Sequence, residues 1–269
     1  MTIFNGFWQG YTQTPATNLL NETPSYVNTV TLFVAAPSPS NTVDTNYLCK
    51  QYSSSQQQVW AKQLQKQNQR VLMSFMDTPS THWNSVNVTT FAQSVEQQVM
   101  ASSGWGLNGV DIDLESGMPS NLWVDTFVKL IVALRKAIGP GAIITADAYT
   151  QSANETAVLQ QTKDQLSWVN TMGYFWGASE MESAAEHYEK IMGSMDKVAI
   201  GVGVGYQSGQ STPLSEVAAL ARYARKNDAG MMLFPLNNDN PATSGDPSVW
   251  GYSETIEANL AAAAKGAGR

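Results

Sequence analysis

Short apolar runs alternate with longer amphipathic segments along the whole chain. The short runs are rich in branched and aromatic residues and end at turn residues, as buried strands do. Eight of them are predicted to be strands, over residues 3–8, 27–35, 71–75, 109–114, 142–147, 168–174, 198–204 and 230–236. Eight strands that alternate with helices are typical of a closed (β/α)8 barrel, an α/β fold also called the TIM barrel. An open, doubly wound sheet is the alternative, but no Gly-x-Gly-x-x-Gly turn follows the first strand.

The clearest helical pattern lies over residues 119–138, where apolar residues recur on one face. We expect Ser116 or Ser120 to cap its start and Gly139 to end it. Two further helices are predicted, one from Thr89 or Thr90 to about Ser103 and one with Pro213 in its first turn that ends near Asn227.

The fourth predicted strand alternates acidic and apolar residues, and residues 108–115 read Asn-Gly-Val-Asp-Ile-Asp-Leu-Glu. Because side chains alternate between the two faces of a strand, Asp111, Asp113 and Glu115 share one face. In a parallel strand covered by helices that face points into a crowded interior, where three carboxyl groups cannot all ionise freely. We therefore expect one of them to hold a proton near neutral pH, as a general acid must.

In a barrel of this kind the residues that follow the strands form the active site. Those positions hold acidic, amide and aromatic side chains: Trp8, Asp77, Trp83, Glu115, Tyr174, Phe175, Trp176, Tyr206, Phe234 and Asn237. Aromatic faces pack against the C–H faces of sugar rings, while sugar hydroxyl groups need polar partners. The set therefore predicts an enzyme that binds a carbohydrate.

A metal site is the main competing interpretation of the acidic alternation. An EF-hand loop that started at Asp111 would need Gly at its sixth position and Glu at its twelfth, where the chain has Ser116 and Leu122. The two histidines, His82 and His187, are far apart in the sequence and have no Cys nearby, so zinc is not favoured. We expect neither a metal nor a cofactor.

Composition narrows the class of partner. The formal net charge is -7 and the basic residues are scattered, which disfavours nucleic acid and an anionic membrane surface. No apolar run reaches the eighteen or so residues that a membrane span requires. Cys49 is the single cysteine, so no disulfide can form within the chain. No linker-like segment divides the chain, and we expect one domain over residues 1–269.

Residues 108–115 resemble the Asp-Gly-x-Asp-x-Asp-x-Glu signature of glycoside hydrolase family 18, with Asn108 in place of the first Asp. The position of the segment on the fourth of eight strands is also similar to that family. The resemblance implies a retaining mechanism in which the 2-acetamido oxygen of the substrate is the nucleophile. It implies no second catalytic carboxylate and no cofactor.

Three further segments are similar to motifs of the same family, although each departs from them. Residues 171–175 resemble the Met-x-Tyr-Asp or Met-x-Tyr-Asn motif of strand six, with Phe175 in place of the polar residue. Residues 230–234 resemble the strand-eight motif, with Phe234 in place of the usual Trp. The third strand keeps only Ser74 of a Ser-x-Gly-Gly motif.

By this resemblance Glu115 is the acid that protonates the leaving oxygen, and Asp113 orients the acetamido nitrogen and stabilises the cyclic cation. Asp111 tunes Asp113 by sharing a proton with it. Tyr174 donates a hydrogen bond to the acetamido oxygen. The residues expected to bind the rest of the substrate are Trp8, Ser74, Asp77, Trp176, Tyr206, Phe234 and Asn237.

The resemblance predicts an endo-acting chitinase that hydrolyses β-1,4 bonds between N-acetylglucosamine units of chitin or a related oligosaccharide. An endo-β-N-acetylglucosaminidase that acts on the chitobiose core of N-glycans is the alternative enzyme. A chitinase-like lectin is the alternative of another class, and the presence of Glu115 disfavours it. Only about 25 residues separate strands seven and eight, so we expect no α+β insertion domain. We also expect a monomer and a secreted protein, although the N-terminus shows no signal peptide.

Overall fold

The computed structural model describes residues 2–206 and 210–261. Eight parallel strands close into a barrel, in the order β1, β9, β8, β7, β6, β5, β4 and β2, with β2 paired back to β1. These strands are β1 (Phe4–Gln9), β2 (Thr29–Pro37), β4 (Arg70–Phe75), β5 (Gly109–Asp113), β6 (Ile143–Ala148), β7 (Trp168–Thr171), β8 (Val198–Gly203) and β9 (Gly230–Phe234). The short strand β3 (Val43–Asp44) adds to the end of β2 in an antiparallel direction. The predicted (β/α)8 barrel is confirmed.

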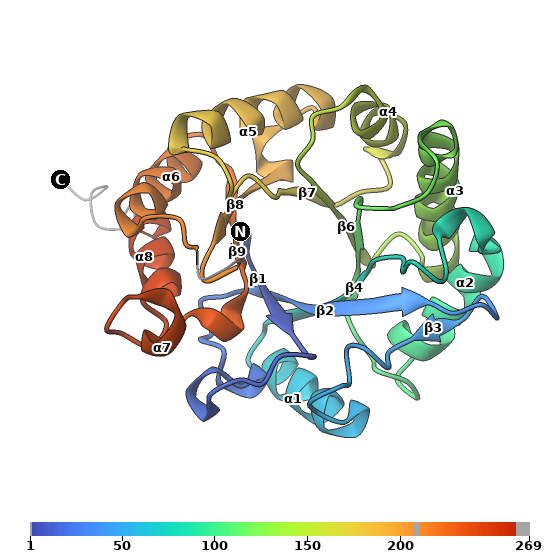
Figure 1. Ribbon diagram of the computed structural model, residues 1–269, viewed down its shortest axis with the longest axis horizontal. Coiled ribbons are helices and arrows are strands. Elements are labelled where there is room, and N and C mark those ends of the chain that lie inside the picture. The colour runs from blue at the N-terminus through green and yellow to red at the C-terminus, as the bar shows by residue number, and fades with distance from the viewer. Residues whose placement is uncertain (1, 207–209, 262–269) are drawn as a thin grey trace.

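Helices surround the barrel, as Figure 1 shows in a view along its axis. They are α1 (Ser54–Lys66), α2 (Val88–Val95), α3 (Ser120–Ile138), α4 (Ala153–Thr162), α5 (Ala178–Met192), α6 (Leu214–Lys226), α7 (Pro241–Ser244) and α8 (Gly251–Leu260). None of the helices in the described ranges is long and apolar enough to cross a bilayer.

Two helix starts differ from the expectation. The side chain of Asn87, rather than Thr89 or Thr90, caps α2, because its oxygen accepts a hydrogen bond from the backbone N–H of Thr90. Helix α3 begins after Pro119 without a side-chain cap, so the predicted cap by Ser116 or Ser120 is wrong. At its other end α3 stops at Gly139, as predicted, where φ is 81°.

The interior of the barrel contains a hydrogen-bonded polar layer instead of apolar side chains alone. The Thr31 hydroxyl donates to Asn5, and the Asn5 amide donates to Asn170. Asn170 in turn donates to Asp147 and to Asp111. All five side chains are buried, so each polar group depends on its neighbours for partners. The layer joins β1, β2, β5, β6 and β7 across the barrel.

Gly109 lies at the start of β5, where the backbone of β6 packs closely against it. A Cβ atom at this position would collide with the backbone carbonyl oxygen of Ile143 on β6. Overpacking of an interior typically costs about 1–3 kcal/mol. We predict that Gly109→Ala lowers the free energy of unfolding by about that amount in urea denaturation. Gly141→Ala is the control, because a Cβ there meets no heavy atom within 4 Å. Equal destabilisation by both variants would contradict the prediction.

Candidate active site

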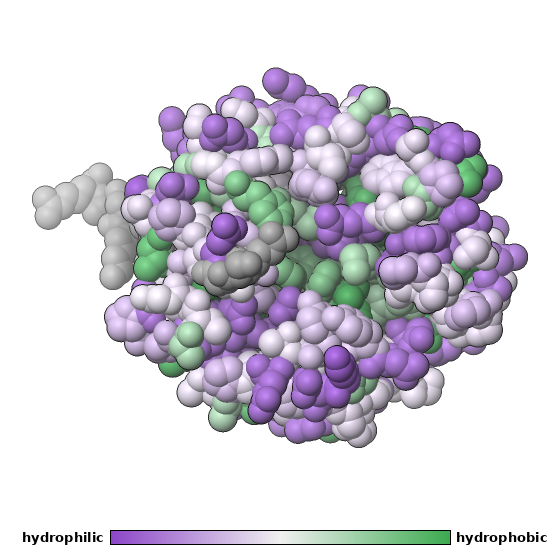
Figure 2. Space-filling view, in the orientation of Figure 1, coloured by the Kyte–Doolittle hydropathy of each residue, from purple (hydrophilic) through white to green (hydrophobic). Residues whose placement is uncertain are grey.

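Two adjoining cavities open at the carboxyl ends of the barrel strands. We call them the inner cavity, of about 260 Å³, and the outer groove, of about 640 Å³. Met76, Glu115 and Tyr149 line both, so Glu115 lies at their boundary. Figure 2 shows the hollow near the middle of this face, with apolar residues inside it and hydrophilic residues around it. A bound chain that passes from one cavity to the other would cross Glu115.

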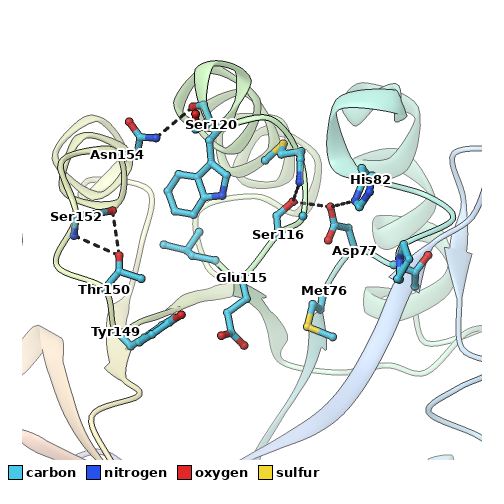
Figure 3. Close-up of a pocket in the computed structure, with 16 residues that line it drawn as sticks. Met76, Asp77, His82, Glu115, Ser116, Ser120, Tyr149, Thr150, Ser152 and Asn154 are labelled. Carbon is cyan, nitrogen blue, oxygen red and sulfur yellow. Dashed lines mark hydrogen bonds and ion pairs between the residues drawn. The ribbon is translucent and has the colours of Figure 1, made fainter. Parts of the chain in front are cut away.

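The three acidic residues occupy two different environments. Asp111 and Asp113 lie within β5 and are 0% and 1% exposed, whereas Glu115 follows the strand and is exposed. The strand ends at Asp113, and the backbone N–H of Glu115 turns back to donate to Asp113 Oδ1 at 2.8 Å. This turn fixes the two carboxyl groups relative to each other and directs Glu115 into the cavities, as Figure 3 shows from the side of the outer groove.

Asp111 is completely buried, and side-chain donors on three strands take the place of water around its carboxyl group. Ser74 Oγ donates to its Oδ2 at 2.7 Å, and the hydroxyl of Thr145 donates to its Oδ1. Asn170 Nδ2 reaches the same Oδ1 at 3.4 Å. Burial raises the pKa of Asp111, while these hydrogen bonds and one with Asp147 lower it. Asp147 is thus a carboxyl neighbour of Asp111, in addition to Asp113, with which the sequence predicts a shared proton.

The other carboxyl groups of the site favour their protonated forms. Burial, followed by the charge of Glu115, raises the pKa of Asp113 well above its ordinary value. Burial also raises the pKa of Glu115, whose carboxyl group lies between the cavity walls although solvent reaches it. These directions agree with the expectation that the acidic alternation retains a proton.

Aromatic rings form much of the wall of the inner cavity. Tyr174 and Phe234 stack with their ring centroids 5.8 Å apart and an interplanar angle of 10°. Tyr206 donates its hydroxyl to the backbone oxygen of Tyr174 at 2.7 Å, which fixes the loop after β7. Burial raises the pKa of Tyr174 well above its ordinary value, so the phenol stays a hydrogen-bond donor. All three residues lie where the sequence predicted them.

Four residues that the sequence predicted to bind substrate line neither of the two cavities. Trp8 faces away from the barrel axis and is completely buried against Tyr52 and Trp60. Its neighbour Phe7 lines the inner cavity instead, because successive side chains of a strand face opposite ways. Ser74 is buried and donates a hydrogen bond to Asp111. Asn237 is buried and forms hydrogen bonds with Gln9 and Thr14. Trp176 packs over Gly173 and lines neither cavity. The expectation of substrate contact is wrong for Trp8, Ser74 and Asn237, and Trp176 does not line the described cavities.

Asp77 lies in the wall of the outer groove, on the loop after β4. Its Oδ2 accepts hydrogen bonds from Ser116 Oγ at 2.6 Å and from the backbone N–H of Trp83 at 3.1 Å, and it contacts His82 Nδ1 at 3.2 Å (Figure 3). These contacts tie together the loops after β4 and β5. Asp77 thus shapes the groove, and its Oδ2 is already engaged by protein groups.

Sequence reasoning missed Phe33, Asp147 and Tyr149, which also line the inner cavity. Asp147 and Thr145 alternate with apolar residues along β6, and this period of two was the signal that could have identified Asp147. In residues 2–206 and 210–261, no group of three or more His, Cys, Asp or Glu side chains could hold a metal ion.

The closed barrel with an acidic signature at the end of β5 is of the glycoside hydrolase family 18 type. More specifically, residues 5–211 match the family described as the endo-β-N-acetylglucosaminidase EndoS TIM-barrel domain. The match covers well over half of the chain, which therefore belongs to this family. No curated protein matches the sequence significantly.

Solved structures with the same fold include several chitinases. A chitinase from Bacteroides thetaiotaomicron has a TM-score of 0.73 and 15% identity, over 97% of this chain and 96% of the other. A family 18 chitinase from Chromobacterium violaceum has a TM-score of 0.74 and 16% identity, over 96% and 83%. Catalytic domain 2 of the group II chitinase from Ostrinia furnacalis, in complex with penta-N-acetylchitooctaose, has a TM-score of 0.73 and 13% identity, over 97% and 96%. These likenesses show the fold.

The raised pKa of Asp113 predicts a pH dependence of stability. A carboxyl group whose pKa is higher in the folded state stabilises the fold at low pH, and this contribution is lost as pH rises from about 4 through the folded-state pKa. We predict that the advantage of Asp113→Asn over the wild type in urea unfolding grows with pH, by up to about 1.4 kcal/mol per unit. Asp125→Asn, an exposed substitution on α3, is the control. An advantage of Asp113→Asn that does not change between pH 4 and 8 would contradict the assignment.

Proposed function

We propose that the protein hydrolyses the β-1,4 bond between two N-acetylglucosamine units, with retention of configuration. The observation that carries this proposal is the position of Glu115 at the boundary of two cavities, beside the buried Asp113. A volume of about 260 Å³ lies below the range of about 300–1,000 Å³ that is usual for drug-sized ligands. The inner cavity therefore suits one sugar ring, and the leaving group of the chain lies in the outer groove.

The chemical step uses one acid and the substrate's own acetamido group. Glu115 transfers its proton to the glycosidic oxygen as the C–O bond breaks, and the leaving group departs into the outer groove. The acetamido oxygen forms a bond to the anomeric carbon from the opposite side, which gives a cyclic cation. Glu115, now ionised, removes a proton from water. The water oxygen then attacks the anomeric carbon and breaks its bond to the acetamido oxygen, so the configuration is retained overall. The raised pKa of Glu115 supports the first proton transfer.

Asp113 and Tyr174 would hold the acetamido group between them. Both line the inner cavity, one from the end of β5 and one from the loop after β7. The phenol of Tyr174 donates to the acetamido oxygen, which restricts that oxygen to the direction of attack. The carboxyl group of Asp113 accepts from the acetamido N–H, and its ionised form is favoured as positive charge develops on the substrate.

Chitin-type chains are the first candidate substrate because an aromatic series leads outward from the inner cavity. Phe234 contacts Phe33 at 5.4 Å between ring centroids, and Tyr11 lies 6.5 Å from Phe33 and 4.4 Å from Tyr47. Tyr47 is exposed, so the series reaches the surface and offers faces for successive sugar rings. An extracellular location and a monomeric state accompany this proposal as predictions.

N-glycans are the second candidate, because the matching family is that of the EndoS TIM-barrel domain. The bond cleaved in the chitobiose core also joins two N-acetylglucosamine units, so the same residues would perform the reaction. The two candidates differ in what the cavities hold beyond the reacting sugar. Release of oligosaccharides from chitin oligomers and from a high-mannose glycopeptide, measured side by side, distinguishes them.

Glu115→Gln is predicted to abolish hydrolysis, because the amide keeps the shape of the side chain but has no transferable proton. The expected loss in kcat is at least about a hundredfold, the smallest usual contribution of acid catalysis. Binding of an N-acetylglucosamine oligomer, measured by calorimetry, should persist. A variant that keeps more than a hundredth of the rate would remove Glu115 from the role of acid.

The acetamido group itself provides a second test, which changes only the substrate. Oligomers of N-acetylglucosamine should be hydrolysed, and fully deacetylated oligomers of the same length should not, because they lack the nucleophile. Product analysis by mass spectrometry measures both. Comparable turnover of the two oligomers would show that the mechanism is not substrate-assisted.

A further inference from the structure

Asp147 is a fourth carboxyl group of the site, and the mechanism above gives it no role. It lies on β6, where its Cα pairs in register with that of Asp113 on β5. Its side chain is 2% exposed and lines the inner cavity together with Asp113, Glu115 and Tyr174. A carboxyl group so deeply buried beside other acids requires a partner that compensates its charge or its proton.

The contacts of Asp147 locate a proton. Asn170 Nδ2 donates to Asp147 Oδ1 at 2.9 Å and lies 3.4 Å from Asp111 Oδ1, so the two carboxyl groups share one donor and are close neighbours. A hydrogen bond between them lowers the pKa of Asp111 and raises that of Asp147. Two carboxyl groups can bond to each other only if one of them is protonated. Asp111 already accepts from Ser74, Thr145 and Asn170, so Asp111 is the acceptor. The proton of the pair therefore belongs to Asp147.

We propose that Asp147 is a positioning residue that stays protonated and donates its hydrogen bond to Asp111, so that Asp111 remains ionised and, of the three aspartates, only Asp113 gains or loses charge during the reaction. This inference rests on the proposed function of the site. A neutral Asp147 adds no third charge to the interior next to Asp111 and Asp113. The substrate's cation then faces one carboxyl group, that of Asp113, whose charge can change.

The surroundings of Asp147 agree with a neutral side chain. Burial raises the pKa of Asp147 well above its ordinary value, and the charges of Asp111 and Asp113 raise it further. The titratable groups that share the cavity or face Asp147 are Asp111 and Asp113 on β5, Glu115 after β5, Tyr149 after β6, Tyr174 after β7 and Tyr206 after β8. Among these neighbours there is no cationic side chain that would stabilise an ionised Asp147.

Asparagine and alanine at position 147 separate the two properties of the side chain. Asparagine imitates the protonated acid, because its oxygen can accept from Asn170 and its amide can donate to Asp111. Alanine removes the donor, which raises the pKa of Asp111. We expect Asp147→Ala to lower kcat by at least about tenfold, which is 1.36 kcal/mol, and to move the acidic limb of kcat/KM to higher pH. Asp147→Asn should recover most of this loss with an unmoved acidic limb.

A direct measurement of the proton does not depend on activity. Infrared spectra of protein with ¹³C-labelled aspartate, recorded in the Glu115→Gln background at pH 7, should contain the C=O band of a protonated aspartic acid. Asp147→Asn should remove a component of this band that Asp113→Asn leaves, because Asp113, whose pKa is also raised, contributes a component of its own when it is protonated. The exposed control Asp125→Asn should change neither component. A band that Asp147→Asn leaves unchanged would overturn the proposal, as would equal losses in the two kinetic variants with unmoved profiles. If no glycan is hydrolysed, the proposed function fails and the infrared result still decides the location of the proton.

Discussion

Asp111 is the group on which the interior of this barrel depends. Barrels of this class usually fill their interior with layers of branched apolar side chains. Here the donors to Asp111 come from β4, β6 and β7, and the amide of Asn170 continues the network through Asn5 to β1 and β2. An unpaired buried polar group costs about 1–3 kcal/mol, so each member of this network constrains the position of the next. The same hydrogen bonds therefore join the barrel strands and hold the carboxyl groups of the interior in place.

The network also distributes charge unevenly among acids that are only a few residues apart. Asp111 receives three side-chain donors from Ser, Thr and Asn, whereas Asp113 receives one backbone N–H, that of Glu115. Donors stabilise the ionised form, and burial without donors stabilises the protonated form. The cavity therefore contains acids of different character although they differ little in sequence. A site of this kind lowers stability near neutral pH and gains acids that can exchange protons there.

The barrel could be predicted from the sequence because the strand pattern and the number of strands extend over the whole chain and do not depend on any single residue. It also singled out Asp111, Asp113, Glu115, Tyr174 and Phe234, which the structure places within β5, at the ends of β5 and β9, or in the loops after β5 and β7. It failed at Trp8 because Trp8 and its neighbour Phe7 are both aromatic and both buried, so the polarity of the side chains does not show which one faces the barrel interior. The helix cap failed at Ser116 because α3 begins only at Ser120, so the Ser116 oxygen accepts from the N–H of Met118, which lies before the helix. The direction of a buried side chain and the first residue of a helix depend on tertiary contacts, which cannot be read from a single sequence.

Glu115 differs from the acids below it because β5 ends two residues before it. Had the strand continued, Glu115 would have joined the ladder and pointed into the interior as Asp111 and Asp113 do. The N–H of Leu114 still donates to the backbone oxygen of Asp147 on β6, and the chain leaves the sheet after it, so that Glu115 lies where the inner cavity meets the outer groove. In the proposed function, the ring held in the inner cavity and the acid at its edge together select which bond of a longer chain is protonated. The length of β5 would then set the site of cleavage, because it sets where Glu115 leaves the strand.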